Sequence, residues 1–479
     1  MLTLLGSPRR TCDGITRRET LAAGALTLLG GGFNLPSLLA AEARKPTTQR
    51  TGKAKNVILL YLLGGAATQD MWDMKPDAPV EIRGEFKPID TVVPGVRICE
   101  HLPMTSRWTH KAAIVRSVNH KAGCHNCLPS YTGFETPMPD QHPRETDPPS
   151  MGAVCEYLRG DRGELPDYVY MPCWLGWGQA FRRAGPYAGF LGQRYNGLTT
   201  ECKPYADPGQ KPVAGKPSIV RGTPLLPNTA FDADLTLDRL KSRRTLLEQF
   251  DDKLKGAESR DAPASYDQTQ QRAFDLLTSS RMRSCFDLSN EDPKRLDRYG
   301  RTLFGSSSLI ARRLIGEGVR FVNVTWDLFW DRIQIDYDAW DTHTKNFSIL
   351  KENKLPHFDQ TFTALIEDLD RDGVLDETLL VVMSEMGRTP RINGNGGRDH
   401  WTFCYSVVFA GAGVKGGTIY GASDSHAAYV KDRPVSTADI CATIYRCLGI
   451  DPHSTMVQDK TGRPVPIHLG GTPIEGILA

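Results

Sequence analysis

The sequence lacks a strong excess of charge of either sign. Its 58 lysine and arginine residues nearly balance 56 aspartate and glutamate residues, which leaves a formal net charge of +2. A chain this close to neutral gives no electrostatic reason to bind nucleic acid. The interior also lacks an uninterrupted apolar run of bilayer-spanning length, and it contains no internal repeat. We therefore expect a globular protein with no membrane span in the mature chain.

The N-terminus has the features of an export signal. Arg17 and Arg18 form an arginine pair, and the mildly apolar stretch 21–41 that follows is broken by Gly30, Gly31, Gly32 and Pro36. This segment resembles a twin-arginine signal; an ordinary basic signal or an uncleaved anchor is the alternative. We expect a periplasmic or extracellular protein that meets the twin-arginine export machinery. The predicted signal covers residues 1–43, and a polar linker covers 44–54.

Cysteine spacing gives little support for a structural zinc site. Cys124 and Cys127 form a C-x-x-C motif, but the sequence has no second motif of this kind to complete four zinc ligands. Eleven cysteines are present, and Cys12 leaves with the signal. The remaining even number permits disulfides in an exported protein without requiring them.

Five apolar runs have the length and composition of buried strands. Amphipathic or helix-forming segments lie between them, and the last segment opens with a capping-box pattern at Ser436 and Asp439. Strands that alternate with helices predict an α/β fold with a mostly parallel central sheet. The expected strands are 56–63, 112–118, 319–325, 378–384 and 406–410, and the expected helices are 303–315, 358–371 and 437–448.

The remaining segments complete the predicted domain organisation. Residues 228–300 are rich in charge and helix formers, which predicts a helical insertion. Residues 131–227 hold many prolines, glycines and aromatic residues, which indicates long ordered loops over one edge of the sheet. We assign residues 55–479 to a single domain that contains both segments.

Carboxylates and imidazoles follow several of the predicted strands. In open α/β sheets, ligands bind at the carboxyl ends of the strands. Carboxylate oxygens and imidazole nitrogens are ligands for zinc, manganese and similar divalent ions, so we expect these side chains to meet at one edge. The candidates are Asp70 after the first strand, His125 after the second, Asp341 and His343 after the third, Glu385 after the fourth and His400 before the fifth.

Several short motifs follow one another along nearly the whole mature chain. They are Leu63-Gly64-Gly65, Val115-Arg116-Ser117, Asp147-Pro148-Pro149-Ser150-Met151-Gly152, Trp340-Asp341-Thr342-His343, Glu385-Met386-Gly387-Arg388-Thr389-Pro390, Gly397-Arg398-Asp399-His400-Trp401 and Arg433-Pro434-Val435. On these motifs the chain resembles the sulfatase-like domain-of-unknown-function family fifteen-oh-one, a branch of the alkaline phosphatase superfamily. The resemblance implies an alkaline phosphatase-like three-layer sandwich and metal-dependent hydrolysis of sulfate or phosphate esters.

The resemblance also implies roles for individual residues. Asp341 and His343 match the short-spaced metal-binding pair of the superfamily, and His400 matches its final histidine. Glu385 stands where the aspartate of an Asp-His pair would be, although methionine replaces the neighbouring histidine. Asp70 lies some residues later than the superfamily's first ligand. The implied cofactor is a divalent ion, namely zinc, manganese, calcium or iron.

The sequence leaves the attacking group open. Cys127-Leu128-Pro129-Ser130-Tyr131 matches the Cys-x-Pro-Ser-Arg of sulfatases except at its last position. Ser130 and Thr132 are alternative nucleophiles, and His125 is either a metal ligand or the base for a metal-activated water. Arg116 and Arg388 either steady an anionic substrate through charge-assisted hydrogen bonds or hold the loops.

Each candidate also has a purely structural alternative. Asp341 could cap a turn, His343 and His400 could be structural histidines, and Glu385 could form an ion pair with Arg388 or Arg398. Four tryptophans could line a sugar-binding cleft or anchor core and loops. They are Trp326, Trp330, Trp340 and Trp401.

Two hypotheses of different classes follow from the sequence. The first is an exported metal-dependent hydrolase that acts on a small anionic ester or a sulfated polysaccharide. The second is a non-catalytic, sulfatase-like binding protein of the cell envelope or of polysaccharide uptake. The clustered acid and histidine motifs favour the first, while the missing Asp-His pair and the unassigned nucleophile favour the second.

Overall fold

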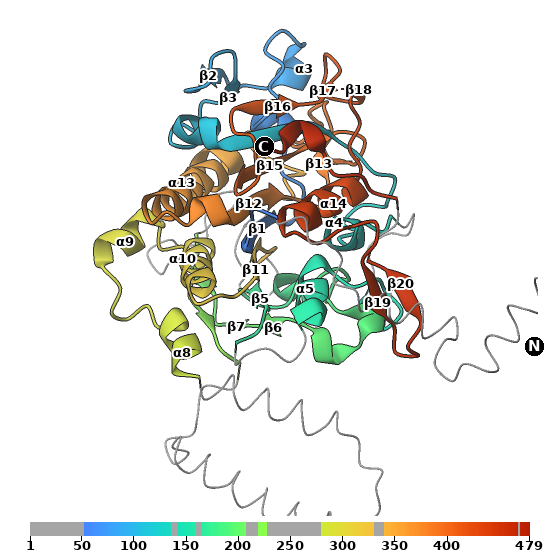
Figure 1. Cartoon of the computed structure of the whole chain (residues 1–479). Coiled ribbons are helices and arrows are strands. Elements are labelled where there is room, and N and C mark those ends of the chain that lie inside the picture. Colours follow the sequence, from blue (N-terminus) through green and yellow to red (C-terminus); the bar gives the residue numbers. More distant parts are fainter. Residues whose placement is uncertain are drawn as a thin grey trace, which may run out of the picture.

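An eight-stranded sheet forms the centre of the protein (Figure 1). The computed structural model describes residues 52–135, 142–159, 165–206, 219–227, 279–329, 340–467 and 470–479. The sheet order is β16 (Thr418–Tyr420), β4 (Ala112–Val118), β15 (Tyr405–Gly411), β12 (Thr378–Met383), β1 (Asn56–Leu62), β11 (Phe321–Trp326), β5 (Tyr168–Met171) and β6 (Leu198–Thr199). Strand β15 is antiparallel to both of its neighbours, and the other adjacent pairs are parallel. The expected α/β fold with a mostly parallel central sheet is confirmed.

Helices cover both faces of this sheet and make three layers (Figure 1). Ile58 and Leu60 of β1 face a core that includes α10 and α13, whereas Val57 and Leu59 face a second core that includes α5 and α14. Alternate residues of a strand point to opposite faces, so a strand buried on both faces must be apolar throughout. The helices are α5 (Met151–Arg159), α10 (Leu303–Gly316), α13 (Leu355–Arg371) and α14 (Thr437–Cys447).

The antiparallel direction of β15 brings the candidate residues to one edge. Strand β4 runs in the same direction as β12, because each is antiparallel to β15. The carboxyl ends of β1, β4, β11 and β12 therefore lie at the same edge as the start of β15. His125 follows β4, Asp341 follows β11, Glu385 follows β12, and His400 precedes β15.

All five predicted strands and all three predicted helices are present, and the predicted capping box at Ser436 and Asp439 is formed. The expectation of loops throughout 131–227 is wrong, because β5, β6 and α5 lie in this segment. The strands β5 and β6 have four and two residues, which is too short for a periodic sequence signal.

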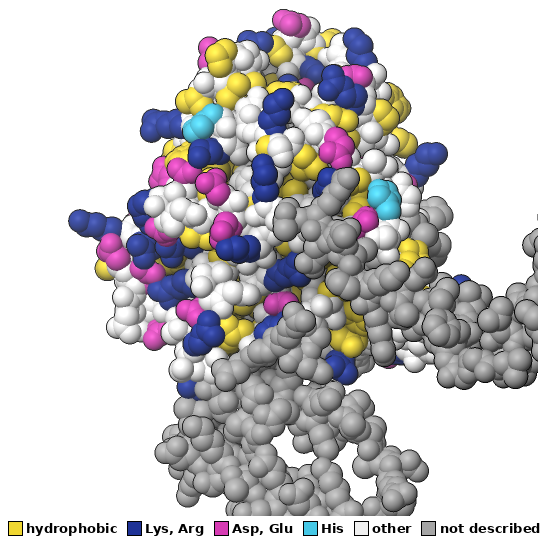
Figure 2. Space-filling view, in the orientation of Figure 1, with side chains coloured by type: hydrophobic (Ala, Val, Ile, Leu, Met, Phe, Trp, Pro, Cys, Tyr) yellow, Lys and Arg dark blue, Asp and Glu magenta, His cyan; other side chains and the backbone are white. Residues whose placement is uncertain are grey.

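Parts of the predicted organisation lie outside the described residues. These are the signal at 1–43, nearly all of the linker, and residues 228–278 of the insertion. The described end of the insertion forms α8 (Ser280–Phe286) and α9 (Pro293–Arg298). None of the helices that the structure describes is long and apolar enough to cross a membrane. On the face drawn in Figure 2, acidic and basic side chains are interspersed, in keeping with the near-neutral sequence.

Candidate metal centre

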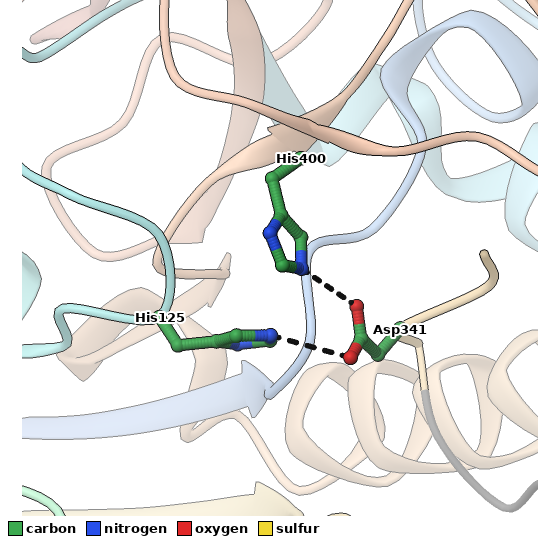
Figure 3. Close-up of side chains that lie close together, drawn as sticks. All are labelled: His125, Asp341 and His400. Atoms are coloured by element: carbon green, nitrogen blue, oxygen red, sulfur yellow. Dashed lines mark hydrogen bonds and ion pairs between the residues drawn. The ribbon is translucent and has the colours of Figure 1, made fainter. Parts of the chain in front are cut away.

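Three side chains from distant parts of the chain meet at the strand edge (Figure 3). His125, Asp341 and His400 each present one ligand atom, and these atoms lie within 4.8 Å of one another. His125 Nε2 is 3.2 Å from Asp341 Oδ2, and His400 Nε2 is 3.1 Å from Asp341 Oδ1. The structure thus brings together three of the residues that the sequence analysis named as candidates.

A third imidazole joins this group. His343 Nε2 lies 3.1 Å from Asp341 Oδ1 and 2.9 Å from His400 Nε2. The His400 ring is 4.4 Å, centroid to centroid, from each of the other two imidazole rings, and it meets both edge to face. Three imidazole Nε2 atoms therefore surround a single carboxylate.

Carboxylates fix the outer nitrogens of two of these imidazoles. His125 Nδ1 is 2.9 Å from Glu385 Oε1, and His343 Nδ1 is 2.7 Å from Asp399 Oδ1. An ionised carboxylate only accepts hydrogen bonds, so each Nδ1 carries the proton and each Nε2 can direct its lone pair inward. Metal-binding histidines are oriented in this way. Glu385, expected as a ligand, instead lies against His125 as an orienting group.

Asp399 was not among the site residues predicted from the sequence. Its position next to His400 in the Gly397–Trp401 motif was the available signal. The side chain of Asp399 also accepts a hydrogen bond of 3.2 Å from Asn393 Nδ2, and Asn393 Nδ2 in turn donates to the His343 carbonyl at 2.9 Å. These contacts hold the carboxylate and the imidazole in one arrangement.

Glu385 is fully enclosed and well supplied with donors. Its Oε1 accepts from the Gly64 amide at 2.8 Å, and its Oε2 accepts from Ser384 Oγ at 3.0 Å. Burial raises the pKa of Glu385, but the hydrogen bond and the charge of His125 outweigh burial and hold the pKa below its usual range. Glu385 therefore remains an acceptor for the His125 proton.

The close approach of the Asp341 segment requires a glycine just after β1, at Gly64. Gly64 has φ of 114°, and a Cβ at this position would lie 2.6 Å from the Asp341 amide nitrogen. Any side chain here would push the Asp341 segment away. The Gly-Gly pair after β1 thus lets two loops approach closely and keeps Asp341 in the cluster.

Arg388 lies beneath Asp341, on the buried side of the cluster. It is fully buried, and it donates to the Gly65 carbonyl at 3.0 Å and to the Arg398 carbonyl at 3.1 Å. Its Nη2 also donates to Asp341 Oδ1 and to the Gly64 carbonyl. The Arg388 guanidinium thus donates to three main-chain carbonyls and to the Asp341 carboxylate, and through these hydrogen bonds it positions Asp341.

Two further candidates lie apart from the cluster. Asp70 receives two hydrogen bonds of 2.8 Å from Arg398 and one of 2.8 Å from Asn346, and all three side chains are buried. Arg116 lies 3.7 Å from Asp73. Asp70 is therefore placed in a buried ion pair, and Arg116 in a separate charged group.

The charges of the cluster shift the pKa values of Asp341 and of the histidines around it. Burial raises the pKa of Asp341, but Arg388 and three imidazoles outweigh burial and hold the pKa far below its usual range. The Asp341 hydrogen bond raises the pKa of His343, and the net effect at His125 is also upward, because two carboxylates outweigh burial. Burial lowers the pKa of His400.

The two hydroxyl groups predicted as alternative nucleophiles, those of Ser130 and Thr132, donate hydrogen bonds to main-chain carbonyls. Ser130 Oγ donates to the Cys127 carbonyl at 2.8 Å, and Thr132 Oγ1 donates to the Leu128 carbonyl at 2.7 Å. All four residues are buried. The partial sulfatase motif thus packs into the core, while His125 precedes it in a left-handed conformation with φ of 54°. Such strain in a non-glycine residue is concentrated at functional sites.

A family model matches nearly the whole chain, and several solved structures align with it at low identity. A family model described as "Protein of unknown function (DUF1501)" matches residues 54–478. The solved structures that resemble it include the PsFucS1 sulfatase from Pseudoalteromonas sp., at 14% identity over 92% of this chain and 73% of that chain, with a TM-score of 0.37. A protein in the alkaline phosphatase superfamily from Vibrio parahaemolyticus has 11% identity over 89% of this chain and 78% of that chain, with a TM-score of 0.35. No curated protein matches the chain.

Proposed function

The chain belongs to the DUF1501 family of proteins of unknown function, and from its site we propose that it is a metal-dependent hydrolase of sulfate or phosphate esters. One observation carries the proposal. Three imidazole Nε2 atoms converge on Asp341, and carboxylates orient two of these imidazoles from behind. The ligand atoms of His125, Asp341 and His400 lie within 4.8 Å of one another, close enough to share one divalent cation, and carboxylates behind His125 and His343 orient them as metal-binding histidines are oriented.

The donor set indicates which cation fits. His125, His343 and His400 offer nitrogen, and Asp341 offers oxygen. Three nitrogens and one carboxylate suit zinc and similar transition metals, whereas calcium prefers six to eight oxygen ligands. We therefore propose zinc or a related transition metal as the cofactor. Such an ion supplies Lewis-acid stabilisation of the charge that develops on the ester oxygens.

Differences in exposure define where an ester approaches. The side chains of His343, His400 and His125 are 34%, 22% and 15% exposed, whereas Asp341 is 8% exposed and Arg388 is enclosed. The imidazoles therefore form the open side and the carboxylate forms the base. An ester bound from the open side would therefore meet the edges of the imidazole rings before it reached Asp341.

A second candidate function is binding without hydrolysis, in the cell envelope or in polysaccharide uptake. It is supported by the hydrogen bonds of Ser130 and Thr132 to main-chain carbonyls and by the commitment of Arg388 to Asp341. Neither hydroxyl faces the cluster as an attacking group, and the arginine is not free for an anion. Turnover measurements separate this candidate from the hydrolase.

We also propose export by the twin-arginine route to the periplasm or the outside of the cell. The pair Arg17 and Arg18 supports this route, which transports folded proteins. The ten cysteines of the described residues form no disulfide among themselves, and all except Cys124 are buried. Buried cysteines without disulfides agree with folding in a reducing compartment before transport.

The test is metal analysis of the purified mature chain followed by an ester screen. An Asp341→Asn, His400→Ala double variant removes two proposed ligands, and His110→Ala removes an exposed histidine outside the cluster as a matched control. We expect stoichiometric metal in the wild type and the control, lost in the double variant, with turnover of aryl sulfate or phosphate esters that follows the metal. Bound metal without turnover supports the binding protein. A folded wild type that binds no metal refutes the metal-dependent hydrolase and the zinc-like cofactor, and it leaves the binding protein.

A further inference from the structure

Three aromatic side chains form an exposed patch beside the metal centre. The ring centroids of Trp401 and Phe403 are 5.0 Å apart, and Tyr429 lies 5.6 Å and 5.8 Å from them. Phe403 is 46% exposed and Tyr429 is 54% exposed. Scattered exposed apolar residues are ordinary, but three aromatic rings in mutual contact at the surface mark a binding site. We refer to Trp401, Phe403 and Tyr429 as the aromatic platform.

The aromatic platform is held in place by hydrogen bonds. The Asp424 carboxylate accepts from the amides of His426, Ala428 and Tyr429 at 3.0, 2.8 and 3.2 Å, which fixes the turn between β17 (Ala422–Ser423) and β18 (Val430–Asp432). The Trp401 indole nitrogen donates to the Ala428 carbonyl at 2.6 Å. Rings that are fixed before a ligand arrives lose little freedom when they bind it.

The platform and the metal centre occupy two faces of one β-ribbon. Strand β14 (His400–Trp401) pairs with β13 (Gly387–Arg388). Adjacent residues of a strand point to opposite faces, so His400 faces the metal centre and Trp401 faces outward. Gln69 Nε2 donates to the Arg388 carbonyl at 3.0 Å and to the Ala427 carbonyl at 3.4 Å, which joins the ribbon to the platform turn. A ligand long enough to pass over the ribbon would contact both faces.

Charged residues of both signs flank Tyr429 in the chain. The acidic ones are Asp424, which accepts hydrogen bonds from three amides of the platform turn, and Asp432; the basic ones are Lys431 and Arg433. Arg433 pairs with Asp432 at 3.1 Å, and both side chains are exposed. The border therefore offers donors and acceptors of both signs.

These charges decide among the ligands that stack on aromatic rings. Lys431 and Arg433 are balanced by Asp424 and Asp432, so the described residues that flank Tyr429 give the platform no net basic charge for a nucleic-acid backbone or an anionic membrane. The rings also lie at 48° to 68° to one another and make a faceted surface. Successive sugar rings fit such a surface, since their C–H faces pack on aromatic rings while their hydroxyl groups remain in water or bond to the polar border.

We propose that the aromatic platform binds the sugar rings of a carbohydrate chain, so that the physiological ester is carried by an oligosaccharide or polysaccharide. The sugar-binding step stands on the platform alone, and only the identity of the ester rests on the proposed hydrolase function. Small aryl esters would reach the metal centre without using the platform.

The test compares a Phe403→Ala, Tyr429→Ala double variant with Tyr205→Ala, which removes an exposed tyrosine elsewhere on the surface. Affinity gel electrophoresis measures binding to soluble neutral polysaccharides, such as dextran and xylan, and to sulfated ones, such as carrageenan and dextran sulfate. We expect at least one polysaccharide to bind the wild type and Tyr205→Ala, and the double variant to bind it about tenfold more weakly. Metal content and turnover of small aryl esters should not change.

Other outcomes overturn the proposal or separate it from the hydrolase. No binding to any polysaccharide, or equal binding by the double variant, refutes the carbohydrate platform. Loss of vesicle binding or of self-association in the double variant would assign the platform to a membrane or a second copy of the chain and would also refute it. Polysaccharide binding that persists in a protein without ester turnover leaves the platform supported and refutes the hydrolase alone.

Discussion

The orientation of His343 by Asp399 can be tested by a single substitution. Asp399→Asn keeps the size of the side chain but replaces a charged acceptor, which lies 2.7 Å from His343 Nδ1, with a neutral amide. Loss of such a carboxylate typically weakens metal binding about 10- to 100-fold. Because Asp399 is 54% exposed, solvent screens its charge, and we expect the low end, about tenfold or about 1.4 kcal/mol.

The assay is competition for zinc against a chromogenic chelator at fixed pH. Asp432→Asn is the matched control, since Asp432 is an exposed carboxylate paired with Arg433 at 3.1 Å outside the cluster. Glu385→Gln should weaken binding more than Asp399→Asn, because Glu385 is enclosed and its charge is not screened. Equal zinc affinity of Asp399→Asn, Asp432→Asn and wild type would refute the role of Asp399, and it would leave His343 outside the ligand set.

Three further predictions concern the metal centre and the buried ion pair of Asp70. Zinc affinity should fall as the pH drops through the raised pKa values of His125 and His343, beginning above the ordinary value of 6.5, because protons compete for the ligand nitrogens; pH-independent affinity in chelator titrations would contradict this. Asp70→Asn should lower the free energy of unfolding of the metal-free protein by about 3–5 kcal/mol, because it leaves a buried arginine uncompensated, and urea denaturation measures the loss. Gly64→Ala should displace Asp341 and abolish stoichiometric metal, as elemental analysis of the folded variant would show.

The sheet was predictable because its strands are buried on both faces. The clearest predicted strand, Val57 to Leu62, is a continuous apolar run, and such runs are distinct from surface loops. Strand β5 has the same character but only four residues, and the glycine- and proline-rich sequence around it indicates loops instead. Its place in the sheet depends on pairing with β11, a contact more than 150 residues away along the chain that no local pattern encodes.

The positions of the candidate site residues were predictable for a related reason. His125, Asp341, Glu385 and His400 all flank strands whose ends meet at one edge, so topology alone brings them near one another. Asp70 satisfies the same rule but lies in an ion pair with Arg398. Sequence position limits a side chain to an edge of the sheet, and differences of a few ångströms within that edge then separate a metal ligand from a structural carboxylate.

The exact positions of Asp70 and Glu385 also affect which metal the centre suits. From sequence, three carboxylates and two histidines counted as ligands, a mixture that also suits hard cations such as calcium. In the structure Asp70 is paired with Arg398, and Glu385 is hydrogen-bonded to His125. The atoms that remain are three imidazole nitrogens and one carboxylate, so the preference shifts toward zinc-like metals. The orienting contacts of the carboxylates, more than their number, therefore set the metal preference that we propose.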